Sequence, residues 1–235
     1  MPAMIAISLV VLFLSCNSGT GKEETKTADT TAAVAAPADV KPAFTPFKVV
    51  LIQHLVKNFD KWEVQYFAHD SVRKAYGITH YVIGRDLKDS NLVYVIDKMD
   101  DLQKAKTFST LPDLKKAMQK AGVSGPPKFS YAEVVRNDDS PTELTERLRV
   151  AHHVKDFDTW LKAYDAEGAA VRSANGLVDR GLARDLVDSN MVYVVFAVSD
   201  MAKAKARAAS PELKKIMTDA GVDGPPTIRW YRLVK

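Results

Sequence analysis

The sequence predicts an α+β protein made of two copies of one β-α-β-β-α-β unit, and two observations carry this prediction. The first is a phrase that occurs twice: HLVKNFDKW starts at His54, and HHVKDFDTW starts at His152. The second is the order of β-rich and helical patterns, which is the same around both phrases. A repeat of this length indicates a duplicated domain rather than the short units of a solenoid.

The repeat extends far beyond this phrase. RDLKDSNLVYV in the first copy recurs as RDLVDSNMVYV in the second, and LPDLKKAMQKAGVSGPP recurs as SPELKKIMTDAGVDGPP. The segment RNDDSPTE between the copies is polar and typical of a turn or linker. We therefore expect a first domain at 45–136, a linker at 137–146 and a second domain at 147–235.

Each copy opens with a strand and a helix. FKVVLIQH, from Phe47, is a short run of residues that favour strands. Asn58 in the first copy and Asp156 in the second are good N-cap residues for the helix that follows. Aromatic residues recur after Asn58 at helical spacing, and we expect Gly77 to end this helix.

The rest of each copy predicts a hairpin, further helical segments and a last strand. ITHYVIGR and LVYVID flank DLKDSN, whose residues favour a turn. MDDLQKAKTFST reads as a helix. SPELKKIMTDAG is a well-marked helix, with Ser210 as N-cap, Pro211 at the first position and Gly221 after its end. Gly-Pro-Pro then leads into the last strand, KFSYAEVV or TIRWYRLV.

This order of elements is that of a ferredoxin-like split β-α-β unit, an antiparallel sheet with helices on one face. A single copy would leave the other face of its sheet apolar and exposed. We therefore predict tandem ferredoxin-like βαββαβ repeats packed sheet to sheet. In this arrangement the second domain is the partner of the first within one chain.

The N-terminal residues carry different signals. The apolar run from Ile5 to Ser15 is too short to span a bilayer, which takes roughly 20 residues, and it fits the core of a signal peptide. FLSC resembles the lipobox of bacterial lipoproteins, in which the cysteine becomes lipidated. We expect a signal peptide at 1–16, lipidation at Cys16, a disordered tether at 17–44, and a membrane-anchored location at the cell envelope. A cleaved signal peptide without lipidation is the alternative.

Composition and motifs argue against several functions. The chain has 235 residues, of which 46% are hydrophobic and 26% charged, and its net charge is +4. Acidic and basic residues are interspersed without a basic stripe, so we expect no nucleic-acid partner. The sequence contains no HExxH pair, nucleophile elbow, phosphate loop or dinucleotide fingerprint, and we expect neither a metal nor a cofactor.

The repeated phrases and the order of elements resemble those of the dimeric α+β barrel superfamily. Within it, the chain is most similar to small bacterial proteins described as antibiotic-biosynthesis-monooxygenase-like or as cyclases, over nearly everything after the tether. The resemblance implies an intramolecular dimeric α+β barrel. It says little about chemistry, because the superfamily includes cofactor-free quinol oxygenases, haem-degrading enzymes, chlorite dismutases and muconolactone isomerases.

His54 and His152 end the first strand of their copies and are the candidate catalytic residues. The structural alternative is a half-buried histidine that bonds the backbone. Aromatic pairs at i and i+4 are candidates for a ligand pocket, and core packing is the alternative for them. Arginines beside the hairpins are candidates too, and surface charge is the alternative for them. The candidates for a ligand pocket are Trp62, Tyr66, Arg85, Tyr94, Trp160, Tyr164, Arg184 and Tyr193.

A further pair of cations does not align simply. Arg73 lies 11 residues after Trp62, whereas Arg172 lies 12 residues after Trp160. One extra residue turns a helix by roughly 100°. Either an insertion falls between these residues, or Lys74 is the true counterpart of Arg172.

The function that these observations favour is the binding of a small aromatic or apolar molecule by a non-catalytic binding or scaffold module. The alternative is a cofactor-independent monooxygenase or isomerase that acts on a quinol- or polyketide-like substrate. The enzyme would need a polar group in an apolar pocket to activate its substrate, a role for which the two histidines are the best candidates.

Overall fold

A computed structural model describes residues 44–234. The expected signal peptide, the lipidation at Cys16 and nearly all of the expected tether lie outside these residues. Within the described part of the chain, no helix is both long and apolar enough to span a membrane.

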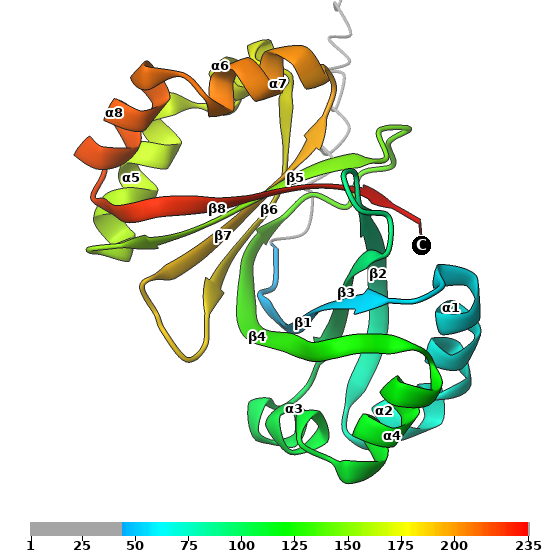
Figure 1. Cartoon of the computed structure of the whole chain (residues 1–235). Helices are drawn as coiled ribbons and strands as arrows, with labels where there is room; N and C mark the ends of the chain where they lie inside the picture. Colours follow the sequence, from blue (N-terminus) through cyan, green and yellow to red (C-terminus); the bar gives the residue numbers. More distant parts are fainter. Residues whose placement is uncertain (1–43, 235) are drawn as a thin grey trace, which may run out of the picture. The chain divides into compact units, whose positions relative to one another are not determined.

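Each half of the described chain has the order β-α-α-β-β-α-α-β (Figure 1). The elements of the first half are β1 (Phe47–Val56), α1 (Phe59–Ala68), α2 (Asp70–Ala75), β2 (Ile78–Asp86), β3 (Leu92–Met99), α3 (Leu102–Ser109), α4 (Pro112–Lys120) and β4 (Val123–Asn137). Those of the second half are β5 (Glu146–Val154), α5 (Phe157–Glu167), α6 (Ala169–Ala174), β6 (Leu177–Asp185), β7 (Met191–Val198), α7 (Met201–Ala208), α8 (Pro211–Asp219) and β8 (Val222–Leu233).

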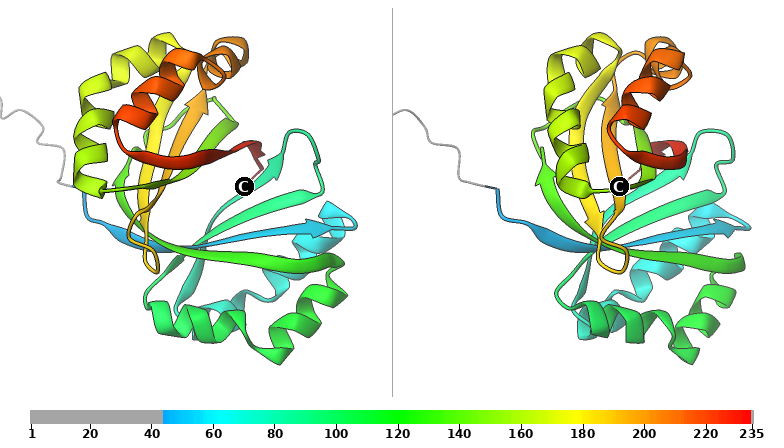
Figure 2. Two further views of the ribbon diagram at one scale, coloured as in Figure 1. Left: turned by 60° about the vertical axis from the view of Figure 1, so that its left-hand side comes forward. Right: turned by 90° about the vertical axis from the view of Figure 1, so that its left-hand side faces the viewer.

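All eight strands join one closed antiparallel barrel in the order β1-β3-β2-β8-β5-β7-β6-β4. Two seams connect the halves: β2 pairs with β8, and β4 pairs with β6. Helices α1–α4 lie outside β1–β4, and α5–α8 lie outside β5–β8 (Figure 2). The predicted α+β class with an antiparallel sheet is confirmed.

Successive side chains of a strand point to opposite faces of the sheet, so the core is divided between the outer and inner faces of the barrel. One apolar cluster packs under the helices of the first half and a second under those of the second half. A third cluster combines residues of both halves, among them Val49, Leu51 and Tyr193. It lies on the inner face, because Val50 and Ile52, the neighbours of Leu51, belong to the cluster under the helices.

Local side-chain bonds explain where several helices begin. Asn58 and Asp156 accept hydrogen bonds from the backbone N–H groups of Lys61 and Thr159, as expected of N-cap residues. Ser210 caps α8 in the same way. These predicted helix starts are confirmed.

Two predicted boundaries differ from the structure. The helix expected to run to Gly77 is broken, at His69 in the first half and at Gly168 in the second, where φ is +80°. The last strands start before the Gly-Pro-Pro motif rather than after it. In β4 this is possible because the pairing with β1 shifts register opposite Pro126 and Pro127, which lack the N–H that a regular ladder needs.

Candidate functional site

The two candidate histidines are buried side chains that point toward the helices. His54 on β1 is 5% exposed, and His152 on β5 is 6% exposed. Each ring lies 5.3 Å from an indole ring of the following helix, Trp62 or Trp160. Among the described residues, neither ring nitrogen of either histidine has a hydrogen-bond partner.

Burial determines the charge of these imidazoles. It lowers the pKa of both His54 and His152 from 6.5 to about 4, because the charged form would lose its hydration. Both rings are therefore neutral near pH 7, with one N–H donor and one acceptor nitrogen each. An unsatisfied buried donor or acceptor costs about 1–3 kcal/mol, so a bound partner for these nitrogens would stabilise the site.

Both histidines line a cavity between the sheet and the helices, but the two cavities differ in size. The first, about 50 Å³, lies among His54, Trp62, Tyr66 and α4. The second, about 110 Å³, lies beside His152 and is walled by α5, α7 and α8. A water molecule occupies about 30 Å³ and an engineered cavity of about 150 Å³ binds benzene, so only the second approaches the size of a single ring.

The aromatic pairs form one wall of each cavity. Trp62 stacks on Tyr66 at 5.2 Å, and Trp160 stacks on Tyr164 at 5.3 Å, as the i, i+4 spacing on a helix allows. These four candidates therefore lie beside the candidate histidines.

Buried arginines also contact the rings of Tyr66 and Tyr164, on which the tryptophans stack. The guanidinium carbons of Arg73 and Arg172 lie 3.8 and 4.0 Å from the ring centres of Tyr66 and Tyr164, and each arginine donates a hydrogen bond to the backbone carbonyl of its tyrosine. Arg73 and Arg172 are thus true counterparts. The inserted residue is Gly168, which separates α5 from α6 and restores the alignment that the helical spacing obscured.

The strand carboxylate beside this arginine differs between the halves, and Arg73 also donates a hydrogen bond to Asp70 on its own helix at 3.2 Å. In the first half, Asp97 on β3 accepts a hydrogen bond from the Tyr66 hydroxyl at 2.6 Å, and its other oxygen lies 3.9 Å from Arg73 Nε. In the second half, Asp179 on β6 accepts two hydrogen bonds from Arg172, at 2.8 and 2.7 Å. Burial lowers the pKa of Arg172, but the bonds to Asp179 outweigh it and raise this pKa above its usual value.

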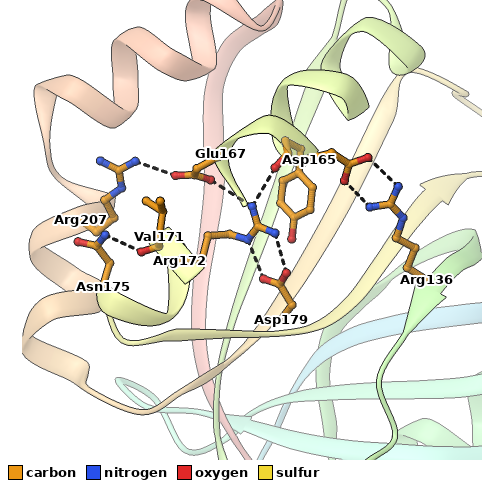
Figure 3. Close-up of polar contacts among 9 residues, drawn as sticks. Arg136, Asp165, Glu167, Val171, Arg172, Asn175, Asp179 and Arg207 are labelled. Atoms are coloured by element: carbon orange, nitrogen blue, oxygen red, sulfur yellow. Dashed lines mark hydrogen bonds and ion pairs between the residues drawn. The ribbon is translucent and has the colours of Figure 1, made fainter. Parts of the chain in front are cut away.

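An ionic network borders the larger cavity (Figure 3). Arg207 on α7 donates to Glu167 at 2.7 Å, and Glu167 also lies 3.4 Å from Arg172. The corresponding residues of the first half are His69 and Phe108, whose rings lie 6.4 Å apart. The second cavity therefore has a charged border where the first has two rings.

The remaining candidates do not join either cavity. Arg85 and Arg184 each donate a hydrogen bond from Nε to a serine carbonyl in the adjacent hairpin turn and cover a phenylalanine ring of the helix. Tyr94 and Tyr193 lie on the inner face of the barrel, where their hydroxyls donate to Asp86 and Asp185 at 2.8 Å. The proposed ligand-pocket set thus divides between the two faces of the sheet.

Sequence reasoning missed the carboxylates, and it underrated the arginines that they pair with. A signal existed: His80 in the first copy becomes Asp179 in the second, while Asp97 becomes Phe196. His80 and Asp97 are Cα partners across β2 and β3, as are Asp179 and Phe196 across β6 and β7. Within residues 44–234, no group of three or more His, Cys, Asp or Glu side chains is placed to hold a metal ion.

Comparison with known proteins supports the fold. No protein-family model and no curated protein matches the sequence. Among solved structures, an anthrone oxidase-like protein matches with a TM-score of 0.53 and 13% identity, over 80% of this chain and 92% of its own. A candidate monooxygenase from Fusobacterium nucleatum matches with a TM-score of 0.50 and 14% identity, over 81% and 93% of the two chains.

A ferredoxin-fold protein from Listeria monocytogenes, related to antibiotic biosynthesis monooxygenases, matches with a TM-score of 0.46 and 14% identity, over 82% and 97% of the two chains. At such low identity the comparisons bear on architecture and leave the chemistry of the site open. The chain shares the fold of a candidate monooxygenase and of an anthrone oxidase-like protein.

Proposed function

We propose that the protein binds a small aromatic or apolar molecule in the cavity of its second half, with the neutral imidazole of His152 as the polar partner. The observation that carries this proposal is an imidazole with both nitrogens unpaired beside a largely apolar cavity of about 110 Å³, which Glu167, Arg172 and Arg207 border. Such sites combine apolar walls with a few polar groups that orient the ligand.

The proposal includes the architecture predicted from the resemblance. The two halves act as tandem ferredoxin-like units that form one dimeric α+β barrel within a single chain. The repeated element order and the two seams, β2 with β8 and β4 with β6, support it. In this arrangement the second half can specialise its cavity while the first retains a small one.

Cofactor-independent oxygenation is the second candidate function. The names of the structurally similar proteins, a candidate monooxygenase and an anthrone oxidase-like protein, favour it. The low pKa of His152, about 4, weighs against it, because a general base works best when its pKa lies near the working pH. Binding without turnover is therefore the better-supported function.

Phenol and toluene test the binding proposal, because they differ in the hydroxyl that can bond an imidazole. In calorimetric titrations we expect phenol to bind about three- to tenfold more tightly than toluene, the effect of one net hydrogen bond of about 1 kcal/mol. His152→Leu should remove this preference and leave toluene binding in place.

The matched control is His54→Leu, which makes the same change beside the smaller cavity and should leave both affinities as they are. Equal affinities for phenol and toluene in the unmodified protein would contradict the proposal. Oxygen consumption with anthrone as substrate, abolished in the double variant of His54 and His152, would decide for the oxygenase instead.

A further inference from the structure

Two arginines lie side by side on the inner face of the barrel without a carboxylate partner among the described residues. Arg149 on β5 and Arg229 on β8 are directly opposed Cα partners. Their chain neighbours Leu148, Val150 and Ile228 pack in the cluster under the helices, so the two arginines face inward. Both Nε atoms are buried and have no hydrogen-bond partner in the described part of the chain.

The guanidinium carbon of Arg149 lies 5.7 and 5.9 Å from the ring centres of Tyr94 and Tyr193, but no carboxylate of the described chain neutralises either cation. Arg229 donates to the carbonyl of Ile228 at 3.1 Å, and no carboxylate of residues 44–234 lies within ion-pair distance of either guanidinium. Like charges directly opposite on neighbouring strands repel, and an arginine keeps its charge inside a protein. The carboxylates of Asp86 and Asp185 are engaged by the hydroxyls of Tyr94 and Tyr193.

The fold itself does not require this pair. The equivalent positions of the first half are Leu51 on β1 and Ser130 on β4, which are Cα partners in the same register. One chain therefore builds the same strand pairing twice, once with a leucine and a serine and once with two arginines. The arginines are a property of the second half, and barrel formation does not account for them.

Two cavities of the barrel interior are lined by Arg149, whose Cα partner on β8 is Arg229. A cavity of about 290 Å³ is lined by Arg149, Tyr231 and apolar side chains that include Leu51 and Leu182. A smaller one, of about 90 Å³, shares Arg149 and Tyr231 and adds Lys128. An anion at Arg149 could therefore place an apolar body in the larger space.

The cavity of about 290 Å³ is also lined by acidic groups, but these have partners of their own. Asp138 lies 3.4 Å from Arg180, and Asp139 accepts a hydrogen bond from the Tyr81 hydroxyl at 3.0 Å. Arg147, a further cation of this cavity, donates to the backbone carbonyls of residues 144 and 146. Of the described arginines that line this cavity, Arg149 is the one with neither a carboxylate nor a carbonyl partner.

We propose that the barrel interior is a second binding site, for an organic carboxylate with an aromatic or short apolar body, held by Arg149 and Arg229. The planar guanidinium fork matches the two oxygens of a carboxylate. The volume of about 290 Å³ exceeds the roughly 150 Å³ that accommodates benzene, so a two-ring body fits. This site lies on the opposite face of β5 from His152 and is independent of the function proposed above.

The test is calorimetric titration of the full chain with 1-naphthoate and with the uncharged 1-naphthylmethanol. We expect naphthoate to bind at least tenfold more tightly than the alcohol. Arg149→Leu and Arg229→Ser, which install the first-half residues Leu51 and Ser130 at their equivalent positions, should each weaken naphthoate binding at least tenfold. Arg149→Lys, which retains the charge, should weaken it less.

Two control variants separate the arginine pair from surface charge and from the His152 cavity. Lys205→Gln removes an exposed positive charge on α7 and should leave naphthoate binding unchanged. His152→Leu should also leave it unchanged, because that side chain faces the helices. In thermal unfolding, naphthoate should raise the Tm of the unmodified protein and not that of Arg149→Leu.

Three results would overturn the proposal. Naphthoate could fail to bind, it could bind equally well to the two arginine variants, or its binding could depend on His152. Inorganic phosphate that binds in an Arg149-dependent way while naphthoate does not would overturn the assignment to an organic carboxylate.

Discussion

At the scale of single residues, burial decides what the two candidate histidines can do. Their rings are enclosed between the sheet and a helix tryptophan, and the described chain supplies no hydrogen-bond partner for them. A neutral imidazole with a pKa of about 4 is a weak base but a good orienting group for a ligand. The same burial makes the stability of the fold sensitive to pH.

Lowering the pH below 6.5 should destabilise the protein through His54 and His152. Because their folded-state pKa values are lowered from 6.5 to about 4, the unfolded state binds more protons in this range. Their stabilisation is present above pH 6.5 and is lost as the pH falls through 4. The full effect is about 3 kcal/mol for each histidine. Urea unfolding at a series of pH values measures it.

The double variant His54→Leu and His152→Leu should lose much less stability between pH 6.5 and 4. Carboxylates with lowered pKa values, such as Asp165 beside Arg136, act mainly below about pH 5, and both proteins retain them, so they cancel in the comparison. If the double variant loses as much stability between pH 6.5 and 4 as the unmodified protein, the two histidines are not the cause of this loss.

At the scale of elements, the seams between the halves depend on close packing of strands. The seam of β2 with β8 has three Cα partner pairs, from Gly84 with Leu233 to Asp86 with Tyr231. Gly84 leaves room for the Tyr231 ring: a Cβ at this position would lie 2.3 Å from Tyr231 Cδ2. Gly181 at the other seam has ordinary space, since a Cβ there would be 3.7 Å from Asn137 Oδ1.

Gly84→Ala should therefore lower the free energy of unfolding by about 1–3 kcal/mol, the usual cost of overpacking a filled core. Gly181→Ala makes the same chemical change at the second seam and should alter stability by no more than about 0.5 kcal/mol. Urea denaturation of the two variants gives the comparison. Equal stabilities would mean that the ring of Tyr231 moves aside at no cost.

At the scale of the whole molecule, each half completes the barrel of the other. The inner apolar cluster draws Val49 and Leu51 from β1 and Tyr193 from β7, so neither half buries it alone. Separation would also expose the backbone hydrogen-bonding groups of β2 and β4 at the seams. Unpaired strand edges of this kind promote association.

Residues 45–136 expressed alone should consequently form homodimers or aggregates. Size-exclusion chromatography with light scattering would give their mass, with the full chain as the reference for a closed barrel. A stable monomer with native-like circular dichroism would show that the first half does not need the second, and it would contradict the proposed pairing within one chain.

Much of the local structure could be predicted because it depends on residues that are close in sequence. The N-caps at Asn58, Asp156 and Ser210 are examples, since each bond spans three residues. The i, i+4 pairing of Trp160 with Tyr164 is another. An insertion before Arg172 was one of two alternatives, but the helix break at Gly168 was missed, because residue spacing does not show where an inserted residue falls.

The candidate site could be predicted only in part. The sequence identified His152, Trp160 and Tyr164, and the structure places all three at one cavity. It did not identify Asp179 as the partner of Arg172, because that bond joins a helix to a strand and depends on how they pack. It also grouped Tyr193 with them, although this residue lies on the opposite face of the sheet.

By itself, the sequence determined the α+β class, the order of strands and helices and the residues that begin several helices, because short-range bonds and hydrophobic periodicity specify these features. The tertiary structure alone decided that one cavity is twice the size of the other and that Arg149 faces Arg229 across β5 and β8. Cavity size depends on how side chains from many elements fill the space between them, and strand register joins residues far apart in the chain.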